Sequence, residues 1–593
     1  MSFSVPWCVS PSTASCRYVI SAGVVVSWAV FGAQLSVAQN SPTDPSALSP
    51  SAYYELQQRA ISLYDKALTT YDSTDFAAAV EPLEKAVGHN LRDGKNWIRL
   101  GDSRYYTGDY RGAIDAYKEA RALGYGFLDG TYRFMDYSIA SSYAELGDKT
   151  KALTWFERSL QEERFPVRRL PLQQTAFSSL HESDRLRSLA GLTPEQSFDS
   201  RVEGWRYDLK FLLSEVRRLN ATYSERPLPD SIERAADQLR ADIPNLSDGE
   251  IWVRFQQLLA KLGQSHNSVW HFEEVERLTI TQLPLSFYLF EDGLHVMDAE
   301  RKGLIGAKVQ AIGGTPTDQA LDAVRSVVTS ETPMKIKWLG PVYLRMPQVL
   351  RVAGIINDTS QVELTLESDD GSSQQISMEP VPIEPRKKLI PSQHPNAGMP
   401  PLYLSHPADP YWMEERPNRG LIYVQVNQIR NEEEESFADF AARLRETLKA
   451  NETNHLVVDL RRNNGGNTFL YTELLRTLVW FDVKVGTDLY VVVGRNTYSA
   501  AQNLATDLDR LTGAVFVGEP TGGRPNTHGD ESHVILPYSG LNLGLSTSYW
   551  QHSDPRDDRQ WIAPDIPVSL SSGDYFDNHD PVMETLRKVI GEK

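Results

Sequence analysis

The stretch "VVVGRNTYSAAQNLATDL", residues 491–508, places a serine at the junction between two elements. A run of β-branched residues ends at Gly494, and a segment with helical periodicity begins at Ser499. A serine in that position can be a helix N-cap. It can equally be a nucleophile above a helix N-terminus, which favours developing negative charge. The stretch alone is compatible with both roles.

Strand-like and helix-like segments alternate on both sides of this junction. The helix-like segments are "SFADFAARLRETLKA" (436–450) and "FLYTELLRTLV" (469–479). The strand-like segments are "GLIYVQVNQI" (420–429), "HLVVDL" (455–460), "DLYVVVG" (488–494) and "AVFVG" (514–518). This alternation predicts an α/β core with a mainly parallel sheet for residues 419–593.

Two of the predicted strands end in glycine pairs. Gly465 and Gly466 follow "VVDLRRNN", and "VGEPTGGRP" (517–525) carries a second pair. Glycine allows a backbone to approach a ligand closely and present its N–H groups. Because α/β proteins place their sites at the carboxyl ends of parallel strands, we expect both turns to lie near Ser499.

Length and composition indicate a multidomain globular protein. A chain of 593 residues is too long for one hydrophobic core. Its content of 41% hydrophobic and 23% charged residues is ordinary for globular domains. The formal net charge of −18, with no basic stripe, argues against binding of nucleic acid.

The N-terminal 38 residues resemble a secretory signal in their layout. Arg17 precedes an uncharged, largely apolar run, residues 18–39, which includes the small-residue triplet Ser36-Val37-Ala38. We therefore predict a signal peptide over 1–38 and export to the periplasm or cell envelope, or secretion. A retained anchor is the alternative, because the run is nearly long enough to span a bilayer, and only then would the protein contact a membrane. Both cysteines, Cys8 and Cys16, precede the predicted cleavage site.

Residues 50–162 carry a repeated helical pattern. Asp75, Asp109 and Asp148 are 34 and 39 residues apart, and each is followed by an alanine four positions later. This pattern resembles tetratricopeptide (TPR) repeats, which implies binding of a protein partner. A generic helical bundle is the alternative.

Residues 198–280 are predicted to be helical and to precede a β domain. The amphipathic segment "LSDGEIWVRFQQLLAKLG" (246–263), capped by Ser247 or Asp248, runs directly into Ser265 and His266.

Residues 281–382 are predicted to form a small β domain. The stretch "GLIGAKVQAIGGTPTDQALDAVRSV" (303–327) resembles half of a PDZ domain, which binds an extended peptide as an added strand. An unrelated small β domain is the alternative. Residues 383–418 are rich in proline and predict an extended linker.

Three motifs that follow one another along the sequence allow the chain to be compared with one particular family. "DLRRNNGG" (459–466), "NTYSAAQNLA" (496–505) and "GEPTGG" (518–523) are similar to the core of the C-terminal processing (tail-specific) serine peptidase family, over roughly 198–593. The resemblance implies that Ser499 is the nucleophile. The Ser/Lys branch of that family uses a lysine base where this chain has Pro520, which cannot accept a proton. The tricorn-like branch uses a histidine from the helical region instead, and this implies that His266 is the base.

The same branch implies the remaining site residues. It uses an acid after the last hairpin, and here Asp554, Asp557 and Asp558 are available. We choose Asp557 because it stands two residues before Arg559 and ahead of the Pro564-Asp565 pair. Ser265 either orients His266 or caps a turn.

The predicted oxyanion hole consists of backbone N–H groups of Gly465 or Gly466 and of Ala500. No cofactor or metal is expected, and "NTHGDESH" (526–533) fits no metal motif and predicts a polar loop.

The leading hypothesis is therefore an exported serine peptidase that acts on peptides or proteins through a Ser-His(-Asp) acyl-enzyme. A non-catalytic scaffold is the alternative, because the same α/β fold resembles the repeated modules of a retinoid-binding protein. An α/β-hydrolase esterase is weaker, because "NTYSA" lacks the G-x-S-x-G elbow.

Overall fold

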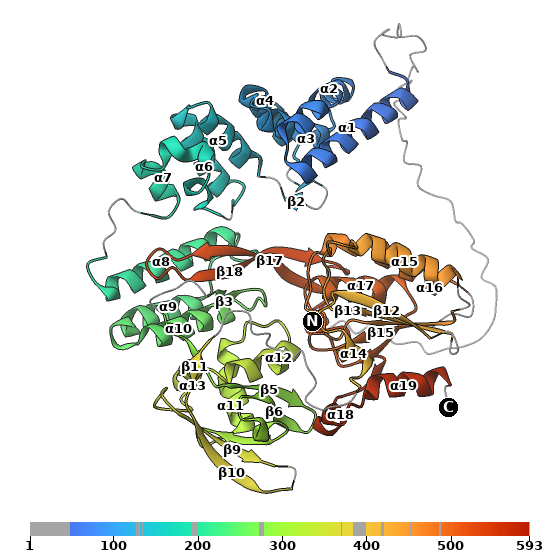
Figure 1. The fold of residues 1–593 in the computed structure, drawn as a ribbon. Helices are drawn as coiled ribbons and strands as arrows, with labels where there is room; N and C mark the ends of the chain where they lie inside the picture. Colours follow the sequence, from blue (N-terminus) through green and yellow to red (C-terminus); the bar gives the residue numbers. More distant parts are fainter. Residues whose placement is uncertain are drawn as a thin grey trace, which may run out of the picture.

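The computed structural model describes residues 48–591 apart from 126, 129–130, 133, 166, 193–197, 272–277, 369, 384–398, 417–419, 451–452 and 485–487. Figure 1 shows a helical array at one end, a helical layer beside a long hairpin, a small β domain and an α/β core. The chain is thus multidomain, with many helices and mixed sheets. The predicted signal peptide, 1–38, lies outside the described residues. Within the described residues, no helix is long and apolar enough to cross a membrane.

The N-terminal array consists of helices that contact one another in chain order. Asp109 and Asp148 are the side-chain N-caps of α4 and α6, while Asp72 caps α2 and Asp75 lies in its first turn. The helices are α1 (Pro50–Thr70), α2 (Ser73–His89), α3 (Gly94–Tyr106), α4 (Tyr110–Ala122), α5 (Met135–Glu145), α6 (Lys149–Gln161) and α7 (Asp184–Leu189), with a short hairpin of β1 (Phe127–Leu128) and β2 (Thr131–Tyr132) and the 3₁₀ turns η1 (Leu170–Leu172) and η2 (Thr175–Leu180).

The repeated alanines explain the close packing of these helix pairs. Ala79, Ala113 and Ala152 are completely buried. A small side chain at the contact lets two helix backbones approach closely. This arrangement is compatible with the expected helical repeats, and their assignment to the TPR class stays a prediction.

A second helical layer leads to His266. It contains α8 (Arg201–Leu219), α9 (Asp230–Asp242), η3 (Ile243–Asn245) and α10 (Asp248–Lys261). Ser247 and Glu250 form a reciprocal capping box at the start of α10. β3 (Ser268–His271) follows and pairs with the long hairpin of β17 (Asn526–Ile535) and β18 (Asn542–Gln551). His266 therefore lies on a short link between a well-anchored helix and a sheet.

The β domain is an antiparallel sheet in the order β10-β9-β7-β6-β5, with β8 paired to β7. Its elements are β5 (Leu285–Phe290), β6 (Gly293–Ala299), η4 (Lys302–Leu304), β7 (Lys308–Ile312), β8 (Thr315–Pro316), α11 (Thr317–Val324), β9 (Val362–Glu367) and β10 (Ser373–Met378); β4 (Thr281–Gln282) and β11 (Val381–Pro382) pair beside it. Gly313 and Gly314 both adopt positive φ in the turn between β7 and β8. Its membership in the PDZ class stays a prediction.

A helical insertion divides this β domain. Residues between α11 and β9 form η5 (Arg325–Val327), α12 (Pro333–Tyr343) and α13 (Pro347–Val352). α12 packs on β5, and α13 packs on α10. The insertion thus joins the β domain to the helical layer that carries His266.

The α/β core has a six-stranded sheet in the order β12-β13-β14-β15-β16-β19, with β12 antiparallel and the others parallel. Alternate residues of its central strands pack on α15–α17 on one face and on α19 on the other. The elements are β12 (Tyr411–Arg416), β13 (Leu421–Val426), α15 (Phe437–Ala450), β14 (His455–Asp459), η7 (Thr468–Leu470), α16 (Thr472–Asp482), β15 (Asp488–Val493), α17 (Ala500–Leu511), β16 (Val515–Gly518), β19 (Ile566–Pro567), α18 (Ser572–Phe576) and α19 (Pro581–Ile590).

Two expected irregular segments contain regular structure instead. The predicted linker 383–418 holds α14 (Leu402–Ser405) and the edge strand β12, because Tyr403, Leu404 and Tyr411 are apolar enough to be buried. The predicted polar loop 526–533 is part of β17, where Asn526 and Thr527 are buried and His528 binds Glu331, while Asp530 and His533 are exposed.

Candidate active site

Ser499 occupies a strained turn between β15 and α17. Its backbone has φ 54° and ψ −126°, a positive φ that is uncommon for a residue with a side chain. Such a conformation costs on the order of 1–3 kcal/mol and persists where the surrounding structure enforces it, often at functional sites. Although Ser499 stands at the N-cap position of α17, its side chain makes no capping hydrogen bond.

The side chain of Ser499 is paired with His266 instead. His266 Nε2 lies 3.1 Å from Ser499 Oγ, within hydrogen-bond reach. The structure therefore brings together two predicted residues that are 233 positions apart.

A chain of hydrogen bonds continues from the other nitrogen of the imidazole. His266 Nδ1 lies 2.6 Å from the hydroxyl of Tyr498, and that hydroxyl lies 2.8 Å from Ser265 Oγ. Ser265 Oγ in turn donates to a carboxylate oxygen of Glu331 at 3.2 Å. Ser265, which the sequence placed beside His266 without a fixed role, thus acts two hydrogen bonds away from it.

The carboxylate of Glu331 determines which group donates in each hydrogen bond of this series. Glu331 only accepts when ionised, so Ser265 donates to it and accepts from Tyr498. Tyr498 then has no proton left for His266, so it accepts one from Nδ1–H. This leaves the lone pair of the imidazole on Nε2, which faces Ser499. The network therefore selects the tautomer that can accept the serine proton.

Burial keeps His266 neutral. Desolvation, followed by the positive charge of Lys335, lowers the pKa of His266 to about 4. Lys335 is 5% exposed, donates to the backbone oxygen of Ser265 and lies 4.1 Å from the centre of the Tyr498 ring. Desolvation lowers the pKa of Lys335 itself to about 7.

Glu331 is also bound from the hairpin β17–β18. His528 Nδ1 lies 2.6 Å from Glu331 Oε1, and Thr527 donates to Oε2 at 2.5 Å. Desolvation raises the pKa of Glu331, but the hydrogen bonds from His528 and Thr527 outweigh it, so that the pKa lies below its usual value. Glu331 therefore remains an ionised acceptor at neutral pH.

The two glycines of "RNNGG" pack directly on this site. A Cβ on Gly465 would lie 2.6 Å from Ser499 Cβ, and one on Gly466 would lie 2.0 Å from the backbone oxygen of Ile429. Both have positive φ. No larger residue fits either position without displacing the backbone or the serine.

Only part of the predicted oxyanion hole has free donors. The N–H of Gly465 donates to Asn463 Oδ1 at 2.9 Å, so the prediction for Gly465 is corrected: its donor is engaged. Within the described part of the chain, no acceptor bonds the N–H of Gly466 or of Ala500. These two groups remain available beside Ser499.

A cavity of about 290 Å³ opens at Ser499. His266 is partly exposed to it, and Phe469 and Trp550, whose rings are 5.7 Å apart, form an aromatic wall. Its remaining lining is Gly466, Asn467, Thr468, Asn503, Thr527, Gly529 and Asp530. Within the described residues, no cluster of three or more metal-ligating side chains occurs.

The structure does not bring Asp557 to His266. Asp557 accepts hydrogen bonds from Arg559 and Ser553, and Arg559 holds the pKa of its carboxyl well below the usual range. Asp554 pairs with Arg556, and the backbone oxygen of Asp558 accepts from Arg524. The prediction that Asp557 serves His266 is corrected, because the carboxyl group of Asp557 is paired with Arg559 and Tyr498 occupies Nδ1 of His266.

Sequence reasoning missed Tyr498, Glu331 and Lys335. Tyr498 precedes Ser499, and this adjacency was its only signal. Glu331 and Lys335 stand at the start of the insertion around α12, 66 and 70 residues from Ser265, and no motif marks them. Only tertiary packing reveals them.

Comparison with known proteins gives a broad likeness. No protein-family model and no curated protein sequence matches the chain. Mature CPAF complexed with lactacystin is 13% identical over 66% of this chain and 98% of its own, with a TM-score of 0.49. The photosystem II D1 C-terminal processing protease is 15% identical over 62% of this chain and 93% of its own, with a TM-score of 0.33. The tricorn protease is 12% identical over 66% of this chain and 37% of its own, with a TM-score of 0.33. At such low similarity, function must be inferred from the site of this chain.

Proposed function

We propose that the protein is a serine peptidase in which Ser499 is the nucleophile and His266 the general base. The observation that carries this proposal is the contact of 3.1 Å between Ser499 Oγ and His266 Nε2, made by a serine in a strained turn whose side chain does not cap its helix. A serine that only capped α17 would have no need for this backbone conformation or for an oriented imidazole.

The proposed reaction is acyl transfer. Ser499 Oγ attacks the scissile carbonyl carbon while its proton passes to His266 Nε2. The imidazolium then gives this proton to the leaving amine, and the C–N bond breaks to form an acyl-enzyme. Water, deprotonated by the same imidazole, attacks the ester and releases Ser499 with its proton restored.

The surroundings of Ser499 supply the other parts of this mechanism. The N–H groups of Gly466 and Ala500 would stabilise the oxyanion of the tetrahedral intermediate. Tyr498 and Ser265 would orient His266, with the Glu331 carboxylate as the negative end of the relay. The cavity with Phe469 and Trp550 would hold the side chains of a peptide next to the scissile bond.

The outer domains complete the proposal. β5 is the edge strand of its sheet and would accept an extended peptide in the manner of a PDZ domain. The helical array α1–α7 would bind a protein partner, and the segment 1–38 would direct export. N-terminal sequencing of protein recovered from the cell envelope or medium tests the predicted cleavage after Ala38.

Labelling with a fluorophosphonate tests the catalytic assignment directly. Wild-type protein should form one covalent adduct, located at Ser499 by peptide mass spectrometry. Ser499→Ala should abolish labelling, and His266→Ala should slow it at least about 100-fold, because general-base assistance contributes roughly that much. Ser360→Ala, at an exposed turn, is the matched control and should label like wild type.

Two results would count against the proposal. Labelling that needs Ser499 but proceeds normally without His266 would remove the histidine from the mechanism. A folded wild-type protein that neither labels nor cleaves denatured protein substrates would favour the scaffold alternative. Cleavage of peptides, rather than esters alone, is needed to establish peptidase activity.

A further inference from the structure

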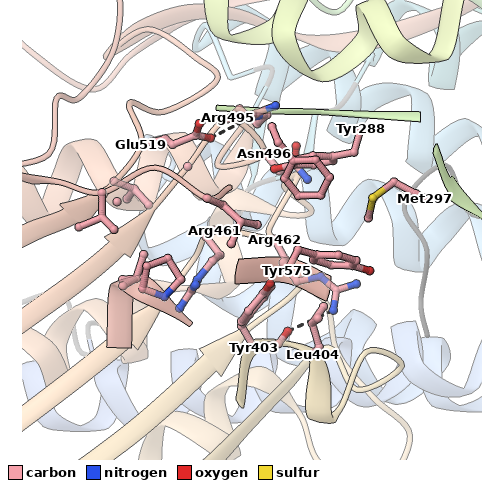
Figure 2. A pocket seen from close by; sticks show the side chains of 18 residues that line it. Tyr288, Met297, Tyr403, Leu404, Arg461, Arg462, Arg495, Asn496, Glu519 and Tyr575 are labelled. Atoms are coloured by element: carbon pink, nitrogen blue, oxygen red, sulfur yellow. Dashed lines mark hydrogen bonds and ion pairs between the residues drawn. The ribbon is translucent and has the colours of Figure 1, made fainter. Parts of the chain in front are cut away.

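A second cavity lies at the carboxyl edge of the core sheet, on the side where the β domain packs. It has a volume of about 100 Å³, which is room for a small organic group. Figure 2 shows Tyr288 and Met297 on one side and Tyr403, Tyr575 and Arg462 on the other. None of the cavity's lining residues lines the cavity at Ser499.

The walls of this second cavity are mostly aromatic and apolar. Phe290, Met297, Tyr403, Leu404 and Tyr575 form one hydrophobic cluster there, and each is buried. Because a preformed apolar space favours an apolar ligand, the walls select for an aromatic or branched aliphatic group.

Three arginines reach this cavity, and their ion pairs differ. Arg461 pairs with Asp459 at 2.7 Å and with Asp580 at 2.9 Å, and Arg495 pairs with Glu519 at 2.7 Å. These two guanidinium groups are therefore neutralised within the protein.

Arg462 differs from its two neighbours. It donates one hydrogen bond, from Nη1 to the backbone oxygen of Tyr403 at 3.1 Å, and no carboxylate of the described residues forms an ion pair with it. Burial lowers the pKa of Arg462 from its usual value, which reflects a cation without a counter-ion. A partly buried guanidinium of this kind is stabilised by an incoming anion.

Two further polar atoms of the cavity lining lack partners. The hydroxyl of Tyr403 and Oδ1 of Asn496 are buried and form no hydrogen bond. The hydroxyl can donate to an anion beside Arg462, and the amide oxygen can accept an N–H. Buried polar atoms are usually paired, so two unpaired ones on residues that line the same cavity point to a missing ligand.

We propose that this cavity binds a monocarboxylate that carries an apolar or aromatic group, with the carboxylate on Arg462 and Tyr403. A single unpaired cation suits one carboxylate, whereas a phosphate dianion would need more donors than the cavity offers. An acylated amino acid has this chemistry in full, because it carries both a carboxylate for Arg462 and an amide N–H that suits the unpaired oxygen of Asn496. Such a group comes either as a free acid or as the last residue of a polypeptide.

Isothermal titration tests this proposal on the full chain carrying Ser499→Ala, which prevents hydrolysis. N-acetyl-L-phenylalanine should bind at least about tenfold more tightly than its amide, because hydrogen bonds to charged groups contribute that much. Arg462→Gln should weaken binding of the acid about tenfold or more. Arg325→Gln, which removes an exposed arginine of the helical insertion, is the matched control and should bind like the parent.

Tyr403→Phe removes only the hydroxyl. The aromatic ring and its contact with Arg461 remain, so the variant protein should fold like the parent. It should weaken binding of the acid by a smaller factor than Arg462→Gln. Equal binding of acid and amide, no binding, or an unchanged affinity in Arg462→Gln would overturn the proposal.

Binding of two further test ligands distinguishes the two possible sources of the carboxylate. Hydrocinnamate that binds as tightly as N-acetyl-L-phenylalanine would support a free acid as the natural ligand. A tetrapeptide ending in phenylalanine that binds more tightly than both would support the end of a polypeptide. Either result depends only on the cavity and stands or falls separately from catalysis at Ser499.

Discussion

Tyr498 connects the imidazole of His266 to the only carboxylate in its hydrogen-bond chain. Its hydroxyl occupies Nδ1, and burial raises the pKa of Tyr498 well above its usual value, so the hydroxyl keeps its proton. A tyrosine in this place orients the imidazole without placing a negative charge in direct contact with it. The hydrogen-bonded link from Glu331 to His266 runs through two neutral hydroxyls, and the carboxylate also acts on the imidazole through space, where its charge raises the pKa of His266.

Replacing Tyr498 by phenylalanine tests this role. Tyr498→Phe keeps the ring, its stacking on His266 and its contact with Lys335, but removes the acceptor for Nδ1–H. We expect kcat to fall about 100-fold with little change in KM, since an unoriented tautomer weakens general-base catalysis. Tyr54→Phe, on the exposed face of α1, should have no effect. Unchanged kcat in a folded Tyr498→Phe protein would exclude the relay.

Burial of His266 and, after it, the charge of Lys335 set the pH range of the site. The base acts while His266 is neutral, and its pKa of about 4 means that activity should persist below pH 6 and be lost as the pH falls through about 4. Lys335 is charged in that range, because its own pKa is about 7. Lys335→Met should therefore raise the pKa of His266 and move the acidic limb to higher pH.

The measurement is the rate of fluorophosphonate labelling as a function of pH, for wild type and Lys335→Met. Lys337→Met removes an exposed charge two residues away and serves as the control. Two results would contradict this account. Wild-type labelling could be lost already near the usual pKa of histidine, or the pH at which labelling is lost could move lower in Lys335→Met.

At the scale of elements, two strand ends, the link after α10 and one insertion form the site. β14 supplies the glycine turn, β15 leads into Ser499, and the link after α10 carries His266. In the insertion, Glu331 lies just before α12 and Lys335 lies in its first turn. The turn after β14 has no room for a side chain, because Ser499 fills the space that a Cβ on Gly465 would need.

Gly465→Ala should therefore disrupt the site. The added methyl group would have to displace Ser499, so labelling should fall at least about 100-fold and the melting temperature should drop. Gly371→Ala is the matched control, because Gly371 also has positive φ but its Cβ would meet open space. It should cost about 1 kcal/mol through its backbone conformation and leave labelling unchanged. Normal labelling of Gly465→Ala would show that Ser499 tolerates displacement.

The sequence predicts the elements of the core better than their connections. Short apolar runs and glycine turns identify β13–β16 and the Ser499 junction, because these signals are local. Glu331 could not be predicted, since its role arises when the insertion packs against β17 and the link after α10. Asp557 is a case in which a sequence pattern predicted a contact that the structure does not form. Its position fits the family pattern, but its carboxyl group is paired with Arg559, two residues away, and not with His266.

At the scale of the whole molecule, the helical array contributes no residue to the cavity at Ser499. It contacts the rest of the described chain through polar links such as Arg168 with Glu215 at 2.9 Å and Arg218 with the backbone oxygen of Phe165 at 2.7 Å. Glu215 also pairs with Arg218, so removal of the array would leave this carboxylate with one partner.

A chain that begins at Phe198 should therefore retain the chemistry. We expect its labelling rate to stay within about threefold of the full chain, while exposure of Phe211 lowers its melting temperature. The same truncation with Ser499→Ala is the control. Loss of labelling in a folded truncated protein would mean that the array acts on the site.

The separation of Ser499 from His266 has a consequence for synthesis of the protein. His266 and Glu331 emerge from the ribosome first, and Ser499 follows 233 residues after His266. The strands β17 and β18, which bind Glu331 and pair with β3, are made later still. An incomplete nascent chain therefore contains His266 and Glu331 without the strands that hold Glu331 in place. The proposed hydrolytic activity would therefore arise only after translation is almost finished.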